Sequence, residues 1–263
     1  MGHPLRFSYP GAVHHVTMRC NNKEFLLDEL LLRVFLELLQ ECSDKFSVPL
    51  YHYCLMTNHV HLLFKVPDVE VISTFMHRLG NLSARRFNAI RGRKGHFWED
   101  RFHSTIVEEG MAMLRCMAYI DLNPIRAGMT TTPGQYQWSG HLDLRNEQEV
   151  LITMNDTYRR LGTTRASRYA TYLHIVKAER RREPYSLAFA LFFGSPQFTR
   201  ELETRFGLSE NSGQSHRIQR LSLGDGIEAV ELRRGGQLHE KVKSGIPDAA
   251  PLISAAHAPI VSP

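Results

Sequence analysis

Cysteines and long hydrophobic stretches are scarce in this chain of 263 residues. Its 4 cysteines, at positions 20, 42, 54 and 116, form no CxxC pair, which argues against a disulfide framework and against a structural zinc site. No run approaches the roughly 18 apolar residues that span a bilayer, and the first residues lack the apolar segment of a secretory signal. We therefore expect a soluble cytoplasmic protein.

Acidic residues are fewer than basic ones, and the formal net charge is +5. Residues 1–150 are balanced, with 16 basic and 16 acidic side chains, and residues 208–263 are balanced with 6 of each. Residues 151–207 hold 10 basic and 5 acidic side chains, so the whole excess lies there. Such a segment can attract phosphate backbones, although a solvated helix face would have the same composition.

Hydrophobic periodicity predicts alternating strands and helices over the first 130 residues. The expected strands cover 13–19, two segments within 50–65, and 102–107, and the expected helices cover 25–46, 69–90 and 111–122. We expect Pro124 to stop the last helix. The order strand, helix, strand, strand, helix, strand, helix is typical of the ferredoxin-like α+β fold, an antiparallel sheet with helices on one face.

The pattern changes after a turn-rich linker at 130–134. We expect a first domain over residues 1–145 and a small, basic, helical extension over 146–207. From about Gly207 onward the chain is rich in Gly, Ser, Pro and Ala and lacks sustained apolar periodicity. That composition favours a disordered tail over residues 208–263.

The motif His59-Val60-His61 lies in one of the expected strands. Residues i and i+2 of a strand point to the same face, so the two imidazoles form a candidate pair of metal ligands. Such a pair is common by chance among 14 histidines. The motif therefore indicates a metal site only if further site residues accompany it.

Tyr119 and Asn123 are candidates for those further residues. They lie four apart in an expected helix and so share a face. Pro124 disfavours helical geometry at Asn123 and is expected to place it at the helix end, where its amide oxygen could turn toward a metal. A core aromatic on an amphipathic helix is the alternative interpretation of Tyr119.

Several ordered motifs resemble those of the single-tyrosine HUH transposases, and in particular of the REP-associated tyrosine transposases. They are GAVHHVTMR at 11–19, MTNHVHLL at 56–63, GHFWEDRF at 95–102 and YIDLNPIRAG at 119–128. The resemblance covers about residues 5–145. Thr57 departs from it, because proline is common there in the family, and so does His141, where tyrosine is usual.

The resemblance implies a role for each matching residue. Tyr119 would be the nucleophile, and His59, His61 and Asn123 would hold Mg²⁺ or Mn²⁺. The implied activity is that of a metal-dependent single-stranded DNA endonuclease and strand transferase, which forms a 5′-phosphotyrosine at palindromic REP-like hairpins. The implied protein is a nucleoid-associated monomer or homodimer.

Basic side chains around the second expected helix and near Tyr119 could contact DNA phosphates, with a solvated charged face as the alternative. They are Arg85, Arg86, Arg91, Arg93, Lys94 and Arg126. Six other histidines are expected to be surface or satisfied core residues, although His103 follows the GHFWEDRF motif and could lie near the site. They are His14, His15, His52, His77, His96 and His103. A non-catalytic DNA- or RNA-binding module is the alternative function, and a replication initiator with the same chemistry ranks lower.

Overall fold

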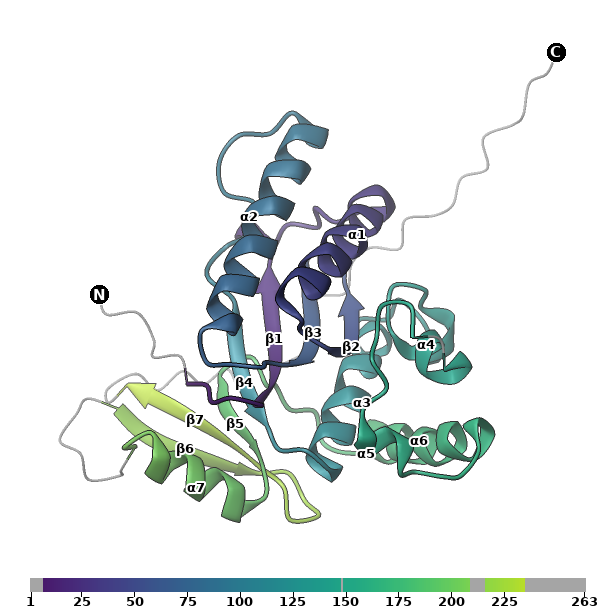
Figure 1. Cartoon of the computed structure of the whole chain (residues 1–263), viewed down its shortest axis with the longest axis vertical. Coiled ribbons are helices and arrows are strands. Elements are labelled where there is room, and N and C mark those ends of the chain that lie inside the picture. The colour runs from purple at the N-terminus through teal and green to yellow at the C-terminus, as the bar shows by residue number, and fades with distance from the viewer. Residues whose placement is uncertain (1–6, 148, 209–215, 235–263) are drawn as a thin grey trace.

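A computed structural model describes residues 7–147, 149–208 and 216–234 of the chain (Figure 1). Its N-terminal half contains four strands and three long helices in the predicted order. The strands are β1 (Val13–Arg19), β2 (Leu50–Leu55), β3 (His59–Lys65) and β4 (His103–Val107), and the helices are α1 (Glu29–Phe46), α2 (Val71–Arg91) and α3 (Met111–Arg126).

These four strands are antiparallel and lie in the order β2-β3-β1-β4. This is the ferredoxin-like arrangement that the sequence predicted, and it places β1 in the middle between β3 and β4. In the register of β1 and β3, Thr17 lies opposite His61 and Arg19 lies opposite His59. Paired residues point to the same face of a sheet. The register therefore gives β1 and β3 one shared face that carries both histidines.

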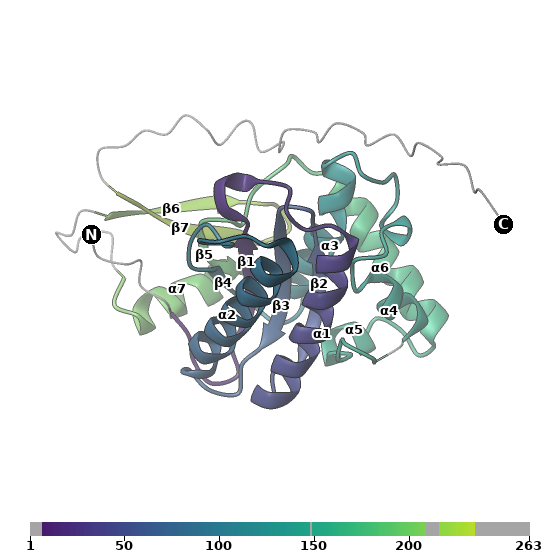
Figure 2. The same cartoon turned by 90° about the horizontal axis from the view of Figure 1, so that it is seen from above.

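The opposite face of the sheet is covered by α1 and α2, which Figure 2 shows together on one side of the strands. Asp28 caps α1 by accepting a hydrogen bond from the Leu31 backbone N–H at 3.1 Å. The helices bury one side each, and the ring of Phe75 in α2 lies 5.1 Å from that of Phe64 in β3. Val60, Leu62 and Phe64 thus point to this layer, leaving His59 and His61 on the other side.

Helix α3 lies on the histidine face and does not stop where we expected. It continues to Arg126 with Pro124 inside it, so the predicted end at Leu122 is wrong. Proline lacks an N–H and leaves the Ile120 carbonyl without its helical donor. The amide nitrogen of Asn123 takes over, donating to the carbonyls of Tyr119 at 2.9 Å and Ile120 at 3.4 Å. A side chain thus replaces the missing backbone donor, and the helix goes on.

The C-terminal part adds helices beside α3, three further strands to the sheet, and a last helix that packs on two of these strands. The helices are α4 (His141–Asn146), α5 (Asp156–Arg159), α6 (Arg165–Arg180) and α7 (Pro196–Arg205), and the strands are β5 (Ala190–Gly194), β6 (His216–Ser222) and β7 (Glu228–Arg234). The complete order is β2-β3-β1-β4-β5-β7-β6, with β5 parallel to β4.

This arrangement corrects two expectations about the C-terminal part. The extension is helical as predicted, but it also contains β5, whose Phe192 and Phe193 are both fully buried. The predicted disordered tail includes residues 216–234, which instead form the antiparallel hairpin of β6 and β7. Residues 209–215 and 235–263 lie outside the described ranges. Within those ranges, no helix combines the length and hydropathy needed to cross a bilayer.

Candidate active site

His59 and His61 lie at the start of β3, with their ring centroids 4.8 Å apart. His59 is half-buried, and the side chain of His61 is buried. The Nδ1 of His59 lies 2.6 Å from the amide oxygen of Asn58. An amide oxygen only accepts, so Nδ1 carries the hydrogen and the Nε2 of His59 keeps a free lone pair. This is the tautomer in which Nε2 can bind a metal ion.

His15 joins this pair from the neighbouring strand. Its Nε2 lies 3.0 Å from the Nδ1 of His61, and the two rings stack. Among the described residues, the Nε2 of His61 is buried without a hydrogen-bond partner. We expected His15 to be a surface or satisfied core histidine, and the structure instead places it in the site. The cause is the strand register, which the sequence alone does not reveal.

All three imidazoles are held neutral by their surroundings. Burial lowers the pKa of His15 to about 3, and burial together with the charge of Arg19 lowers the pKa of His59 to about 4. The pKa of His61 lies well below its usual value, because burial acts together with His59, His15 and two arginines. Neutral imidazole is the form that ligates metals.

The donor set fits a divalent ion in part. The buried, unpartnered Nε2 of His61 and the oriented Nε2 of His59 are suitable ligands, since a buried polar atom normally has a partner. Among the described residues, no three His, Cys, Asp or Glu side chains form a metal-binding group. A third ligand would therefore be an oxygen from another source. Asn123 has such an oxygen, while its amide nitrogen is held by the helix.

Tyr119 on α3 lies against the histidines. Its ring centroid is 6.0 Å from that of His61 and 5.8 Å from that of His15, edge to face in both cases. Tyr185 of the extension stacks on it at 5.4 Å, and the guanidinium of Arg126 lies 5.1 Å from the ring centre. The structure thus brings together the predicted nucleophile and the predicted metal pair.

The hydroxyl of Tyr119 is shielded, and its side chain is only 7% exposed. Burial raises the pKa of Tyr119, while the charge of Arg126 and hydrogen bonds with the Leu187 backbone and the Ser186 side chain partly offset that rise. Residues 185–187 therefore form a wall of the site. Nothing in the composition of residues 185–187 differs from an ordinary loop, so the sequence carries no signal for this wall.

Asp121 anchors α3 through a buried polar cluster. Its carboxylate accepts from His52 at 2.8 Å, from His141 at 2.7 Å and from the hydroxyl of Tyr172 in α6 at 2.6 Å. Burial alone would raise the pKa of Asp121, but the two histidines bring it below its ordinary value. His141, one of the two departures from the family pattern, thus helps to hold the helix that carries Tyr119.

The predicted DNA-contacting residues fall into groups. Arg91 pairs with Asp28, and Arg93 lies 3.6 Å from Glu24, so both already have acidic partners. Arg126 contacts Tyr119 at the site. The rest of the set, Arg85, Arg86 and Lys94, is exposed and has no ion pair among the described residues.

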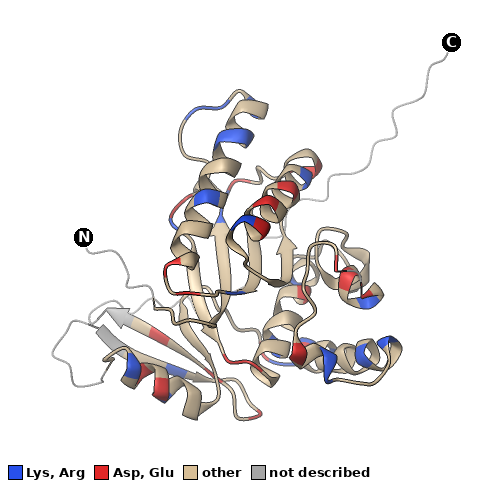
Figure 3. Cartoon of the chain, in the orientation of Figure 1, with Lys and Arg blue, Asp and Glu red and all other residues tan. Residues whose placement is uncertain are grey.

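Helix α2 contains no acidic residue, and Figure 3 marks the positions of its arginines and of the basic residues of the following loop in blue. This helix lies on the sheet face away from the histidines. A contact between the basic residues of α2 and DNA stays a prediction.

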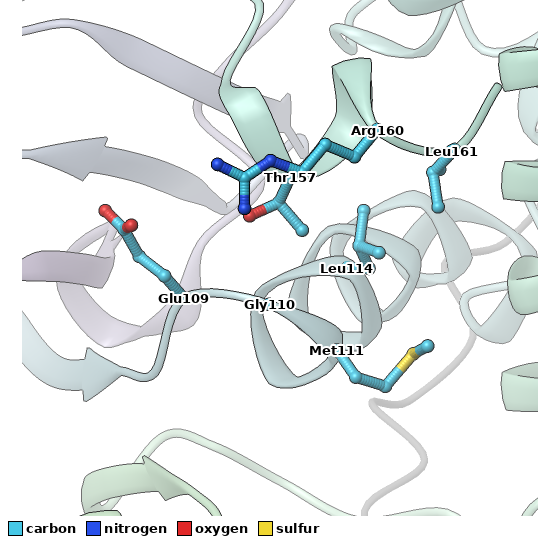
Figure 4. Close-up of a pocket in the computed structure, with 7 residues that line it drawn as sticks. All are labelled: Glu109, Gly110, Met111, Leu114, Thr157, Arg160 and Leu161. Atoms are coloured by element: carbon cyan, nitrogen blue, oxygen red, sulfur yellow. The ribbon is translucent and has the colours of Figure 1, made fainter. Parts of the chain in front are cut away.

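Two surface hollows lie away from the histidine pair. One, of about 360 Å³, is found at the start of α3, and its lining includes Met111 and Leu114 of α3, Thr157 of α5 and Arg160 just after α5 (Figure 4). The other, of about 370 Å³, runs along α2 and includes Arg85. Neither is lined by His59, His61, Tyr119 or Asn123.

Comparison with known proteins shows which family the N-terminal part of the chain resembles. Residues 8–123 match the family model described as "Transposase IS200 like". This part of the chain is therefore similar to IS200-like transposases, as its motifs indicated, and the match supports a transposase-like DNA-processing role. The match ends at Asn123, so it includes the histidine pair and Tyr119 but not the extension.

Two solved structures are similar to the chain. One is described as a REP-associated tyrosine transposase bound to a REP hairpin, with 17% identity, coverage of 60% of this chain and 93% of that chain, and a TM-score of 0.47. The other is a candidate transposase from Deinococcus radiodurans R1, with 20% identity, coverage of 46% and 96%, and a TM-score of 0.34. No curated protein matches the chain.

Proposed function

We propose that the protein is a metal-dependent single-stranded DNA endonuclease and strand transferase, with Tyr119 as its nucleophile. The observation that carries this proposal is the contact between Tyr119 and His61, which come from distant parts of the chain and meet at 6.0 Å between ring centroids. Tyr119 lies edge to face with two imidazoles, which distinguishes its surroundings from a purely apolar core. The motif resemblance suggests palindromic REP-like hairpins as the first substrates to try.

His59 and His61 would hold Mg²⁺ or Mn²⁺, with the amide oxygen of Asn123 as the proposed third ligand. When bound, such an ion polarises a phosphate and neutralises developing negative charge. Because Tyr119 reaches His61 of the same chain, we further propose that one protomer contains a complete site. A monomer that forms the covalent adduct would support this, and activity found only in a dimer would contradict it.

In the chemical step, a DNA phosphate is transferred from a 3′ oxygen to the oxygen of Tyr119. The Tyr119 oxygen bonds to phosphorus as its hydroxyl proton departs, and the bond from phosphorus to the 3′ oxygen breaks. The leaving oxygen takes up a proton and becomes a 3′-OH, while the 5′-phosphate stays on Tyr119. A second 3′-OH then attacks that phosphate and restores the tyrosine. Arg126 lies beside the ring, where its charge favours the phenolate form.

The test is formation of a covalent protein–DNA adduct. The protein is incubated with single-stranded hairpins from its own genomic surroundings and Mn²⁺, and a shifted band is sought on a denaturing gel. Tyr119→Phe should abolish the adduct and leave hairpin binding nearly intact, whereas the control Tyr51→Phe on β2 should keep both. An adduct on Tyr119→Phe would disprove the nucleophile. Metal-independent binding without an adduct would favour the non-catalytic module.

A further inference from the structure

An exposed aromatic side chain lies beside the candidate site. Phe189, just before β5, is 70% exposed. Its ring lies edge to face with that of His103, at 5.8 Å between centroids. Single exposed apolar residues are common on protein surfaces. Phe189 differs because of its position relative to the histidine pair.

The position follows from the strand register. His103 on β4 lies opposite Thr17 on β1, and Thr17 lies opposite His61 on β3. These three residues form one row across the histidine face. Since neighbouring strands are about 4.8 Å apart, the backbones of His103 and His61 are separated by roughly 10 Å. Phe189 lies against His103, at the far end of that row from His61.

The segment that carries Phe189 is fixed to the same face of the sheet. The hydroxyl of Thr105 on β4 donates to the carbonyls of Leu187 at 3.2 Å and Ala190 at 2.7 Å. Thr105 lies opposite His15 in the register, so it points to the histidine side. Leu187 in turn contacts the hydroxyl of Tyr119. One short segment thus supplies both a wall beside the nucleophile and the exposed ring.

A positive charge lies next to the histidine pair, on the strand between β3 and β4. Arg19 is exposed, lies opposite His59, and follows Thr17 by two residues on the same face. Its positive charge acts together with burial to lower the pKa of His59. A cation followed by an exposed aromatic ring is the pattern that binds single-stranded nucleic acid, the cation holding the backbone and the ring stacking on a base.

We propose that Phe189 stacks on an unpaired base of the DNA strand, a few nucleotides from the phosphate that lies at the histidine pair. This inference rests on the proposed function for the location of that phosphate. Stacking of this kind tolerates any base, because every base has a π face. Phe189 would therefore strengthen binding of the single-stranded flank of a hairpin without reading its sequence, and would add nothing to the binding of a fully paired duplex.

The experiment measures binding and base stacking with the full chain. Single-stranded oligonucleotides carry 2-aminopurine at successive positions on either side of the cleavage site, and fluorescence quenching reports the stacked position. Phe189→Ala should abolish the quenching at one position and weaken single-strand binding roughly 5- to 150-fold. Phe189→Tyr keeps a ring and should restore both. Leu30→Ala, which truncates a 51% exposed side chain on the other face, is the matched control.

The outcomes separate this inference from the proposed chemistry. In adduct formation, Phe189→Ala should raise KM for the oligonucleotide and leave kcat nearly unchanged. Equal single-strand affinity and quenching in Phe189→Ala and the wild type would overturn the stacking role. Quenching that depends on Phe189 without any adduct would contradict the chemistry and support the stacking. A protein that binds no single strand would contradict both.

Discussion

Replacing His15 by phenylalanine should weaken metal binding at the candidate site. The ring of His61 has two nitrogens, and among the described residues its only hydrogen-bond partner is His15, through Nδ1. If Nδ1 donates to His15, the lone pair of His61 is on Nε2, where a metal can take it. In His15→Phe both tautomers become accessible, and the ring loses its fixed orientation.

The size of the effect follows from the kind of contact that is lost. Removing the hydrogen-bond partner of a ligating histidine lowers metal affinity by about 10- to 100-fold, or roughly 1.4–2.7 kcal/mol. Phenylalanine preserves an aromatic ring at a site that is 2% exposed, and its larger volume is expected to cost about 1–3 kcal/mol of stability. His15→Gln, whose amide can accept the same hydrogen bond, should recover part of the affinity.

The assay is Mn²⁺ binding by calorimetry or by electron paramagnetic resonance, without DNA. His14 provides a matched control, because it is the neighbouring residue, is fully buried and bonds to Ser104 on the other side of the sheet. His14→Phe should reduce stability and leave Mn²⁺ affinity unchanged. Wild-type Mn²⁺ affinity in His15→Phe would refute the reasoning, as would an equal loss in both variants.

Three further predictions concern stability. Glu179→Ala should lower the free energy of unfolding by about 3–5 kcal/mol, because the buried guanidinium of Arg115 would lose the carboxylate that lies 2.9 Å from its Nε. A loss below 1 kcal/mol in urea denaturation would contradict this. In the same assay, Gly194→Ala should lower the free energy of unfolding by about 1–3 kcal/mol, because the added Cβ would lie 2.6 Å from the ring carbon Cδ1 of Phe198. An unchanged urea midpoint would refute this. His15 and His59 have pKa values of about 3 and 4 in the folded protein against 6.5 as the ordinary value, so the unfolded chain takes up protons first. The folding stability that these two neutral histidines contribute is complete above about pH 6.5 and is lost as the pH falls toward 4. A Tm that does not change from pH 7 to 5 would exclude this contribution.

Local patterns were sufficient to predict the order of β1–β4 and α1–α3. Alternation around His59 and helical spacing in α1 are strong signals that need no information from distant residues. The side chains of His61 and Tyr119 meet within one chain, because α3 packs on the sheet face that α1 and α2 leave open.

The remaining features depend on contacts between distant segments. His15 reaches His61 only through the register of β1 and β3. Helix α3 passes Pro124 only because the side chain of Asn123 supplies a donor, which no propensity scale records. β5 pairs with β4, far away in the sequence, and the β6–β7 hairpin then pairs with β5, so these strands depend on an existing sheet edge.

Helix α3 is held to α6 at two points, by Asp121 with Tyr172 and by Arg115 with Glu179. Both contacts are buried, so separating the helices would expose or strand ionic groups at a cost of several kcal/mol. Tyr119, the proposed nucleophile, therefore cannot move with α3 alone, because α6 would have to move with it. If the proposed chemistry holds, any shift of the tyrosine between cleavage and rejoining must displace both helices together.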